Sequence, residues 1–184
     1  MIKKLLQATI VMTGLLAVGA CTLGKASTTA PTKPAAADYQ AAVPPSPPPT
    51  NLRGICYTPA DLTTYRARML QQEFSVGTLQ CQTPSGSRAY NDQYAAFVAK
   101  FQSELTSNTR SLQQLAGRKR FNIDVVVTEF ANRTAQRAPV DKEFCSRMKR
   151  AFDWVLSAQV TTLAQAPPPY DLGPEMNVHP CPAP

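Results

Sequence analysis

The sequence has few of the residues from which small enzymes build an active site. It contains a single histidine, His179, and only 17% of its 184 residues are charged. One histidine excludes any mechanism or metal site that requires two. A G-x-S-x-G nucleophile motif, a phosphate-binding loop and an H-E-x-x-H pair are also missing. We therefore expect no enzyme and no cofactor. Acids on the predicted helices are expected on solvated faces, among them Glu73, Asp92, Glu104 and Glu129.

Proline is scarce only in the middle of the chain. Of 17 prolines, seven lie within residues 22–55 and seven within 165–184, whereas the middle holds only Pro59, Pro84 and Pro139. Proline fixes φ and donates no backbone hydrogen bond, so proline-rich stretches with few large apolar residues do not form a packed core. We therefore predict a folded domain at 56–164, a disordered Pro/Ala/Thr-rich tether at 21–55 and a Pro-rich tail at 165–184.

The first 20 residues have the pattern of a secretory signal peptide. Lys3 and Lys4 precede an apolar run that ends in small residues. The run is too short for an ordinary membrane-spanning helix, whereas a basic start and a short apolar region are typical of an export signal. Residues 1–20 are therefore expected to direct export and to be removed.

Val18-Gly19-Ala20-Cys21, at the end of that run, resembles the lipobox of bacterial lipoproteins, with Val18 where Leu is commonest. The resemblance covers residues 1–21 only. It implies that Cys21 carries a diacylglycerol, is usually N-acylated (palmitate being a typical chain) and becomes the first mature residue. Thr22 at the next position resembles the outer-membrane sorting pattern, which implies a domain facing the periplasm. The alternative is cleavage after Ala20 by the ordinary signal peptidase.

The number of cysteines favours lipidation of Cys21. An exported protein with five cysteines leaves one thiol unpaired, and assigning Cys21 to lipid leaves four. Two or more acyl chains anchor a protein stably, since each buried methylene contributes about 0.8 kcal/mol. The tether that follows includes the run Pro44–Pro49, which favours polyproline II. At about 3.1 Å per residue, residues 22–55 reach roughly 100 Å when fully extended.

The middle of the chain predicts an all-α domain. Thr58, Pro59 and Asp61 supply an N-cap, a first helical residue and a capping box for a helix that ends near Cys81. Leu62, Tyr65, Met69, Val76 and Leu79 are expected to form its packing seam. Further helices are expected at about 90–116, with Gly117 as C-cap, at 121–135, and from Pro139–Asp141 onward, burying residues as far as Leu163. The run 123–127 is also compatible with a strand, but a single strand would have no partner. Four helices with short loops predict an up-down bundle.

This arrangement selects one cysteine pairing among three. The first helix ends at Cys81 and the fourth begins near Cys145, so both lie at one end of the bundle. Cys56 precedes the first helix and Cys181 follows the tail, at the other end. We predict the disulfides Cys81–Cys145 and Cys56–Cys181. A zinc site of thiolates with His179 is the competing interpretation, and we do not favour it because His179-Pro180-Cys181 lacks an established ligand spacing.

The positive charge of the domain is small. Between Cys56 and Cys181 the net charge is about +3, whereas a nucleic-acid-binding protein has a stronger basic stripe. Two clusters could still bind an anionic envelope polymer or lipid head group: Arg118, Lys119 and Arg120, and Arg147, Lys149 and Arg150. We expect first a non-catalytic envelope lipoprotein that presents its helical domain to another envelope protein. Binding of anionic groups comes second, and a small periplasmic enzyme third.

Overall fold

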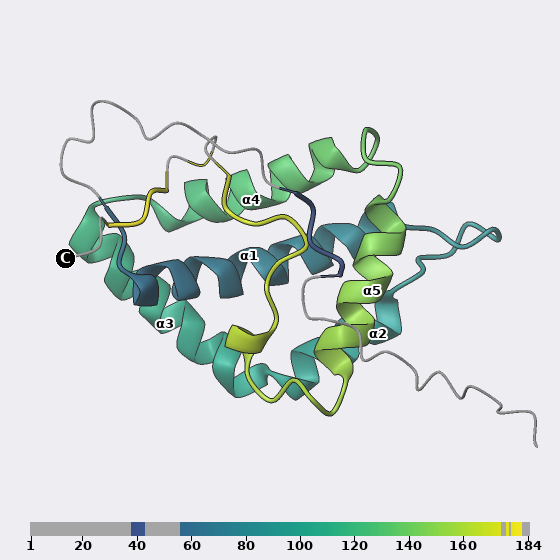
Figure 1. The fold of residues 1–184 in the computed structure, drawn as a ribbon, viewed down its shortest axis with the longest axis horizontal. Helices are drawn as coiled ribbons and strands as arrows, with labels where there is room; N and C mark the ends of the chain where they lie inside the picture. The colour runs from purple at the N-terminus through teal and green to yellow at the C-terminus, as the bar shows by residue number, and fades with distance from the viewer. Residues whose placement is uncertain (1–37, 43–55, 174–175, 177, 182–184) are drawn as a thin grey trace, which may run out of the picture. The chain divides into compact units, whose positions relative to one another are not determined.

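The computed structural model describes residues 38–42, 56–173, 176 and 178–181. The signal peptide at 1–20, Cys21 and most of the predicted tether lie outside the described residues. Five α-helices make up most of the described chain (Figure 1): α1 Pro59–Gln80, α2 Asn91–Lys100, α3 Gln102–Lys119, α4 Ile123–Arg137 and α5 Phe144–Leu156. A short 3₁₀ turn, η1, covers Leu163–Gln165.

The all-α prediction is confirmed for the described residues. Their β pairing is limited to two isolated bridges, Tyr57 with Pro180 and Gln82 with Arg88. The β-branched run at 123–127 lies in α4, where the Asn122 side chain accepts hydrogen bonds from the N–H groups of Asp124 and Val125. This N-cap satisfies backbone donors that the start of a helix otherwise leaves unpaired. It is a local reason why residues 123–127 form a helix and not a strand.

The N-terminus of α1 is formed as predicted. The Thr58 hydroxyl accepts from the Asp61 N–H at 3.2 Å, and the Asp61 carboxylate accepts from the Thr58 N–H at 3.0 Å, which completes a capping box. The helix ends at Cys81 as expected. Of the predicted seam, Leu79 is the exception, because its side chain is 50% exposed.

The predicted second helix is two helices. Phe101 ends α2 and begins α3, with φ −111° and ψ 18°. Its ring is buried beside Phe97, with the ring centroids 5.6 Å apart. The break lets α2 pack on α5 while α3 packs on α1. Gly117 is not the C-cap: α3 continues to Lys119, and Arg120 takes the left-handed conformation at φ 58°.

The four-helix up-down bundle is not confirmed. In Figure 1 α1 runs through the middle of the domain, α4 lies alongside it in the same direction, and α5 crosses it near its C-terminal end. Apolar side chains on α1 consequently enter two core clusters, one with Phe74, Phe97 and Phe152 and the other with Tyr65 and Phe130. The fourth helix is also shorter than expected, since α5 ends at Leu156 and Leu163 is buried from η1.

Part of the predicted disordered tether packs on the domain. Residues 38–42, called here the arm, lie against the proline-rich stretch that follows η1 (Figure 1). The Tyr39 side chain is only 2% exposed and belongs to the core. The tether prediction is therefore wrong for these five residues. One large aromatic ring and backbone hydrogen bonds are enough to fix a segment whose composition otherwise favours disorder.

Candidate functional site

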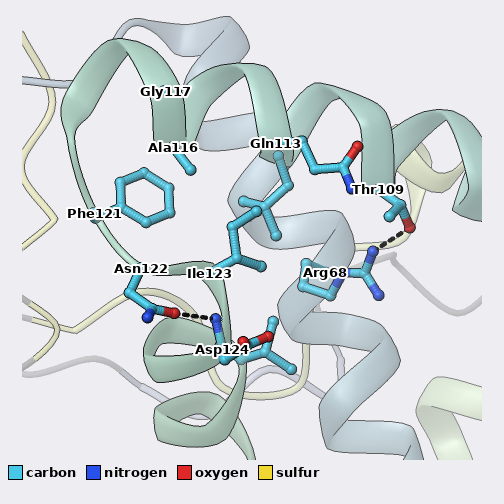
Figure 2. Close-up of a pocket in the computed structure, with 11 residues that line it drawn as sticks. Arg68, Thr109, Gln113, Ala116, Gly117, Phe121, Asn122, Ile123 and Asp124 are labelled. Atoms are coloured by element: carbon cyan, nitrogen blue, oxygen red, sulfur yellow. Dashed lines mark hydrogen bonds between the residues drawn. The ribbon is translucent and has the colours of Figure 1, made fainter.

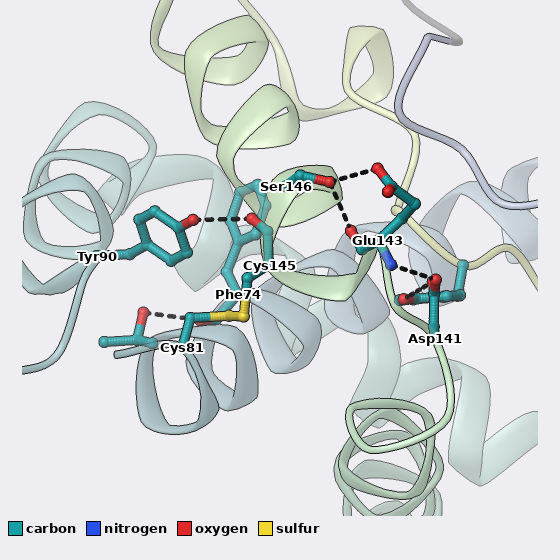
Figure 3. Close-up of a disulfide and its surroundings, with 9 residues drawn as sticks. Phe74, Cys81, Tyr90, Asp141, Glu143, Cys145 and Ser146 are labelled. Atoms are coloured by element: carbon teal, nitrogen blue, oxygen red, sulfur yellow. Dashed lines mark hydrogen bonds between the residues drawn. A yellow bond between two sulfur atoms is a disulfide. The ribbon is translucent and has the colours of Figure 1, made fainter. Parts of the chain in front are cut away.

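Both predicted disulfides are present. Cys81–Cys145 joins the end of α1 to the start of α5, and Cys56–Cys181 joins the residues that flank the domain, with Cα–Cα distances of 5.6 and 4.6 Å. Figure 3 shows the first of these beside Tyr90, whose hydroxyl donates to the Cys145 carbonyl oxygen at 2.7 Å. The tail is tied back as expected. The Tyr57 N–H donates to the His179 carbonyl oxygen, and the Cys181 N–H donates to that of Tyr57.

The first basic cluster is largely engaged with the domain itself. Arg118 pairs with Asp61 at 2.8 Å, at the N-terminus of α1. The Lys119 ammonium donates to the Cys56 carbonyl oxygen at 2.6 Å and lies over the Tyr57 ring. Arg120 is the exposed C-cap of α3. This cluster therefore presents less free positive charge than its sequence indicates.

The second cluster is also engaged. Arg147 pairs with Asp141 at 3.2 Å and is half-buried, while Lys149 pairs with Asp153 and Arg150 with Glu143 on the surface. The two clusters lie near opposite ends of α1. The helix has 22 residues, so its ends are about 30 Å apart. The structure does not bring the six predicted anion-binding residues together into one site.

The structure instead concentrates interactions where the arm meets the tail. The Tyr39 hydroxyl donates to the Pro167 carbonyl oxygen at 2.8 Å, the Gln40 side chain to that of Pro168, and the Ala41 N–H to that of Pro169. Arg147 of α5 donates to the Tyr39 carbonyl oxygen at 2.8 Å. The arm is thus bonded to two segments more than 100 residues away in the chain.

Tyr170 is the centre of this junction. The guanidinium groups of Arg137 and Arg147 lie 4.8 and 5.5 Å from the centroid of its ring. Its hydroxyl donates to Asp141 at 2.6 Å. Burial raises the pKa of Asp141, but hydrogen bonds from Tyr170, from the Glu143 N–H and from Arg147 outweigh it and lower the pKa overall. Asp141 therefore stays a carboxylate and holds the side chains of Arg147 and Tyr170 in place.

Glu73 lies under the junction and is fully buried, so the prediction of a solvated face is wrong for this residue. One carboxyl oxygen accepts from the Tyr170 N–H at 3.1 Å, and the other has no partner in the described residues. Burial raises the pKa of Glu73 well above its usual value, Asp171 adds to that, and the hydrogen bond and Arg137 oppose it. The sequence contained a signal: Glu73 follows Met69 by four and precedes Val76 by three, on the packing seam.

The other predicted acids behave differently from Glu73. Asp92 is exposed in the first turn of α2, and Glu129 forms an ion pair with Arg133 one turn along α4. Glu104 is half-buried and accepts from the Leu163 N–H at 2.9 Å, which fixes the start of η1. None of these three carboxylates is brought next to Glu73 by an interaction in the described residues. The acidic side chain that acts electrostatically on Glu73 is instead Asp171 of the tail.

The larger described pocket lies elsewhere, between α3 and the start of α4 above Arg68 of α1 (Figure 2). Its volume is about 640 Å³, and its wall combines apolar and polar side chains. A second pocket of about 250 Å³ lies between α4 and the segment around Tyr57 and is mostly apolar. No pattern in the sequence indicates either pocket.

Neither a metal cluster nor a membrane-spanning helix occurs in the part of the chain that the structure describes. No three His, Cys, Asp or Glu side chains come together there as a metal site would need. None of the described helices combines the length and the apolar character needed to cross a bilayer. In comparisons with known proteins, no family model, no curated protein and no solved structure matches this chain.

Proposed function

We propose that this protein is a non-catalytic lipoprotein of the cell envelope, anchored through lipid on Cys21, that presents its helical domain to another envelope protein. The observation that carries the proposal is the pairing of cysteines. The four cysteines of the described residues bond with one another, so Cys21 is the remaining member of the five in the sequence. A lipid on Cys21 would leave no free thiol in an exported protein.

The disulfides also support export. Both bonds close long stretches of chain, with separations of 125 and 64 residues. Disulfides of this kind persist in oxidising compartments such as the periplasm and are rare in a reducing cytosol. The signal-like pattern of residues 1–20 and the disulfides thus agree on the compartment, and the pattern around Thr22 favours the outer membrane.

The docked arm supports a domain held close to its membrane. About 18 residues separate Tyr39 from Cys21. At no more than about 3.6 Å per residue they span at most ~65 Å, whereas a free tether to Cys56 would reach roughly 100 Å. The arm also fixes where the anchored chain leaves the domain, beside α5 and the tail. A short connection with a defined exit favours one face of the domain being presented to a partner.

Binding of an anionic polymer or head group remains the second proposal, and its support is weaker. Five of the six basic residues that would carry it already interact with acidic side chains, a carbonyl oxygen or an aromatic ring. An anion would have to compete with those interactions. The structure favours no reaction for the third proposal, a small enzyme.

Mass spectrometry of the N-terminus of the mature protein, purified from its native membrane, tests the anchor. We expect the chain to begin at Cys21 with a diacylglyceryl group, and a Cys21→Ser variant to be released from membranes. A mature chain with unmodified Cys21, or a Cys21→Ser variant that stays membrane-bound, would contradict the proposal.

In-cell photo-crosslinking tests the partner. Val140 is an exposed apolar residue, 77% accessible, in the turn between α4 and α5, and it is a suitable position for the crosslinker. We expect a discrete adduct with an envelope protein that disappears in the Cys21→Ser background. Adducts with lipid or polymer alone would favour the second proposal instead.

A further inference from the structure

Arg68 is a half-buried cation without a carboxylate partner among the described residues. One terminal nitrogen donates to the Gln71 side chain at 2.8 Å and the other to the Thr109 hydroxyl. Its Nε is buried and has no hydrogen-bond partner. Burial lowers the pKa of the guanidinium, yet arginine stays protonated in proteins. A buried charge usually has an opposite charge to compensate its lost hydration, and here the two protein acceptors are neutral.

The guanidinium lines the pocket between α3 and α4. Figure 2 shows Arg68 beside Thr109 on one side of the hollow, with Phe121 and Asn122 on the other. The volume of about 640 Å³ lies within the range of small-molecule sites. The remaining wall is largely apolar, from Leu112, Ala116, Phe121, Ile123 and Val127. Such a site combines a polar anchor with an apolar surface.

Gly117 is one of the residues that line this pocket. It lies within α3, where glycine is destabilising relative to alanine. A Cβ added at Gly117 would meet no atom within 4 Å, so the missing side chain is not required by packing. A larger side chain therefore has room at this position, which borders the pocket.

We propose that this pocket binds a small amphipathic monocarboxylate, with its carboxylate on Arg68 and its apolar part against the wall formed by α3 and α4. The Arg68 Nε is shielded from solvent, so a carboxylate would bind the terminal nitrogens, each of which has a second N–H besides its bond to Gln71 or Thr109. The Asp124 carboxyl group lines the same pocket, and it would repel a doubly charged phosphate more than a singly charged group. The wall also favours a ligand with an apolar body over a bare inorganic anion. Binding of this ligand would not require the membrane anchor or a protein partner.

Octanoate and its neutral analogue octanamide test the proposal. They are titrated into the ¹⁵N-labelled full chain carrying Cys21→Ser, and the resonances of Arg68 Nε–H and the Gly117 amide are followed. We expect saturable shifts with octanoate. Arg68→Gln is expected to weaken octanoate binding roughly 10- to 100-fold, the range for hydrogen bonds to a charged group, and to leave the weaker octanamide binding unchanged.

Two further variants separate the pocket from general charge. Gly117→Leu adds a large side chain at the wall of the pocket and is expected to weaken binding of both probes without unfolding the domain. Arg110→Gln removes the same charge from an exposed position of α3 outside the pocket, and it is expected to bind octanoate like the parent chain. The proposal is overturned if octanoate produces no saturable shift, if Arg68→Gln and Arg110→Gln behave alike, or if octanamide binds as tightly as octanoate.

Discussion

The carboxyl group of Glu73 is fully buried, and burial raises its pKa well above the usual value. Tyr39 of the arm, Arg137 of α4 and Asp171 of the tail are the titratable groups that act on it or are affected by it. A buried carboxyl group is less costly when protonated than when charged. Since its pKa is higher in the folded than in the unfolded chain, the folded state binds the extra proton. The contribution of Glu73 to stability is therefore greatest at low pH and is lost as pH rises through the folded pKa.

Replacing Glu73 with Gln is expected to stabilise the protein at pH 8 and to have little effect at pH 4. At pH 8 the variant avoids the charged form, and we expect a gain of about 1 to 3 kcal/mol, the usual penalty for an uncompensated buried polar group. Urea unfolding at several pH values measures this. Asp92→Asn, at an exposed position of α2, is the control and should follow the parent chain. A Glu73→Gln curve that runs parallel to the parent between pH 4 and 8 would refute the assignment.

At the scale of elements, two helical glycines show how packing decides the effect of one methyl group. Gly77 lies where α5 crosses α1, and a Cβ there would come within 2.9 Å of the Met148 side chain, which is itself buried. Gly117 lies in α3, where a Cβ would meet nothing within 4 Å. Both positions are helical, so alanine has the same propensity advantage at each.

The substitution Gly117→Ala is expected to stabilise the domain by about 0.5 to 1 kcal/mol. Gly77→Ala is expected to lose that gain and to destabilise the domain, by about 1 to 3 kcal/mol as in other overpacked cores. Thermal unfolding of the two variants side by side measures the difference. If Gly77→Ala proved as stabilising as Gly117→Ala, the close approach of α1 and α5 described here would be wrong.

At the scale of the whole molecule, two covalent links hold the ends of the domain. Cys56–Cys181 closes the chain at the start of α1, and Cys81–Cys145 ties the end of α1 to α5. Each closes a long stretch of chain, and the chain-entropy argument gives about 4 to 5 kcal/mol for each such closure.

Replacing either pair by serines is expected to cost about 2 to 5 kcal/mol, with different local effects. Without Cys56–Cys181, hydrogen exchange should increase at the amides of Tyr57 and of position 181, which bridge the two segments, while α5 amides change only with global stability. Without Cys81–Cys145 we expect faster exchange at the start of α5. Identical exchange patterns in both double variants would show that the two links do not act locally.

The docking of the arm also depends on contacts between distant parts of the chain. Tyr39→Ala removes a buried ring and its hydrogen bond to Pro167. The lost burial is worth about 1.5 to 3 kcal/mol, which should raise the fraction of molecules with a released arm roughly 10- to 100-fold. Limited proteolysis within 38–42 measures this release. Tyr39→Phe keeps the ring and should be cleaved at an intermediate rate, whereas equal rates for all three proteins would mean that Tyr39 does not hold the arm.

Local patterns allowed the sequence to predict a good part of the fold. The capping box at Thr58 and Asp61 and the end of α1 near Cys81 depend on residues within a few positions of one another. The helical prediction for 123–127 depended instead on the lack of a partner strand. The break at Phe101 was missed because no glycine or proline marks it. There the burial of aromatic rings against α5 and α1 outweighs local helix propensity.

The sequence by itself determined the helical class, the cysteine pairing and the likeness of residues 1–21 to a lipoprotein signal, because these follow from periodicity, the order of helix ends and short motifs. Only the tertiary structure decided that Glu73 is buried, that the arm docks beside the tail, and that Arg68 lines a pocket. The Tyr39–Pro167 and Glu73–Tyr170 contacts join residues 128 and 97 positions apart. Such contacts depend on how the helices cross and where the chain returns, which local sequence patterns do not specify.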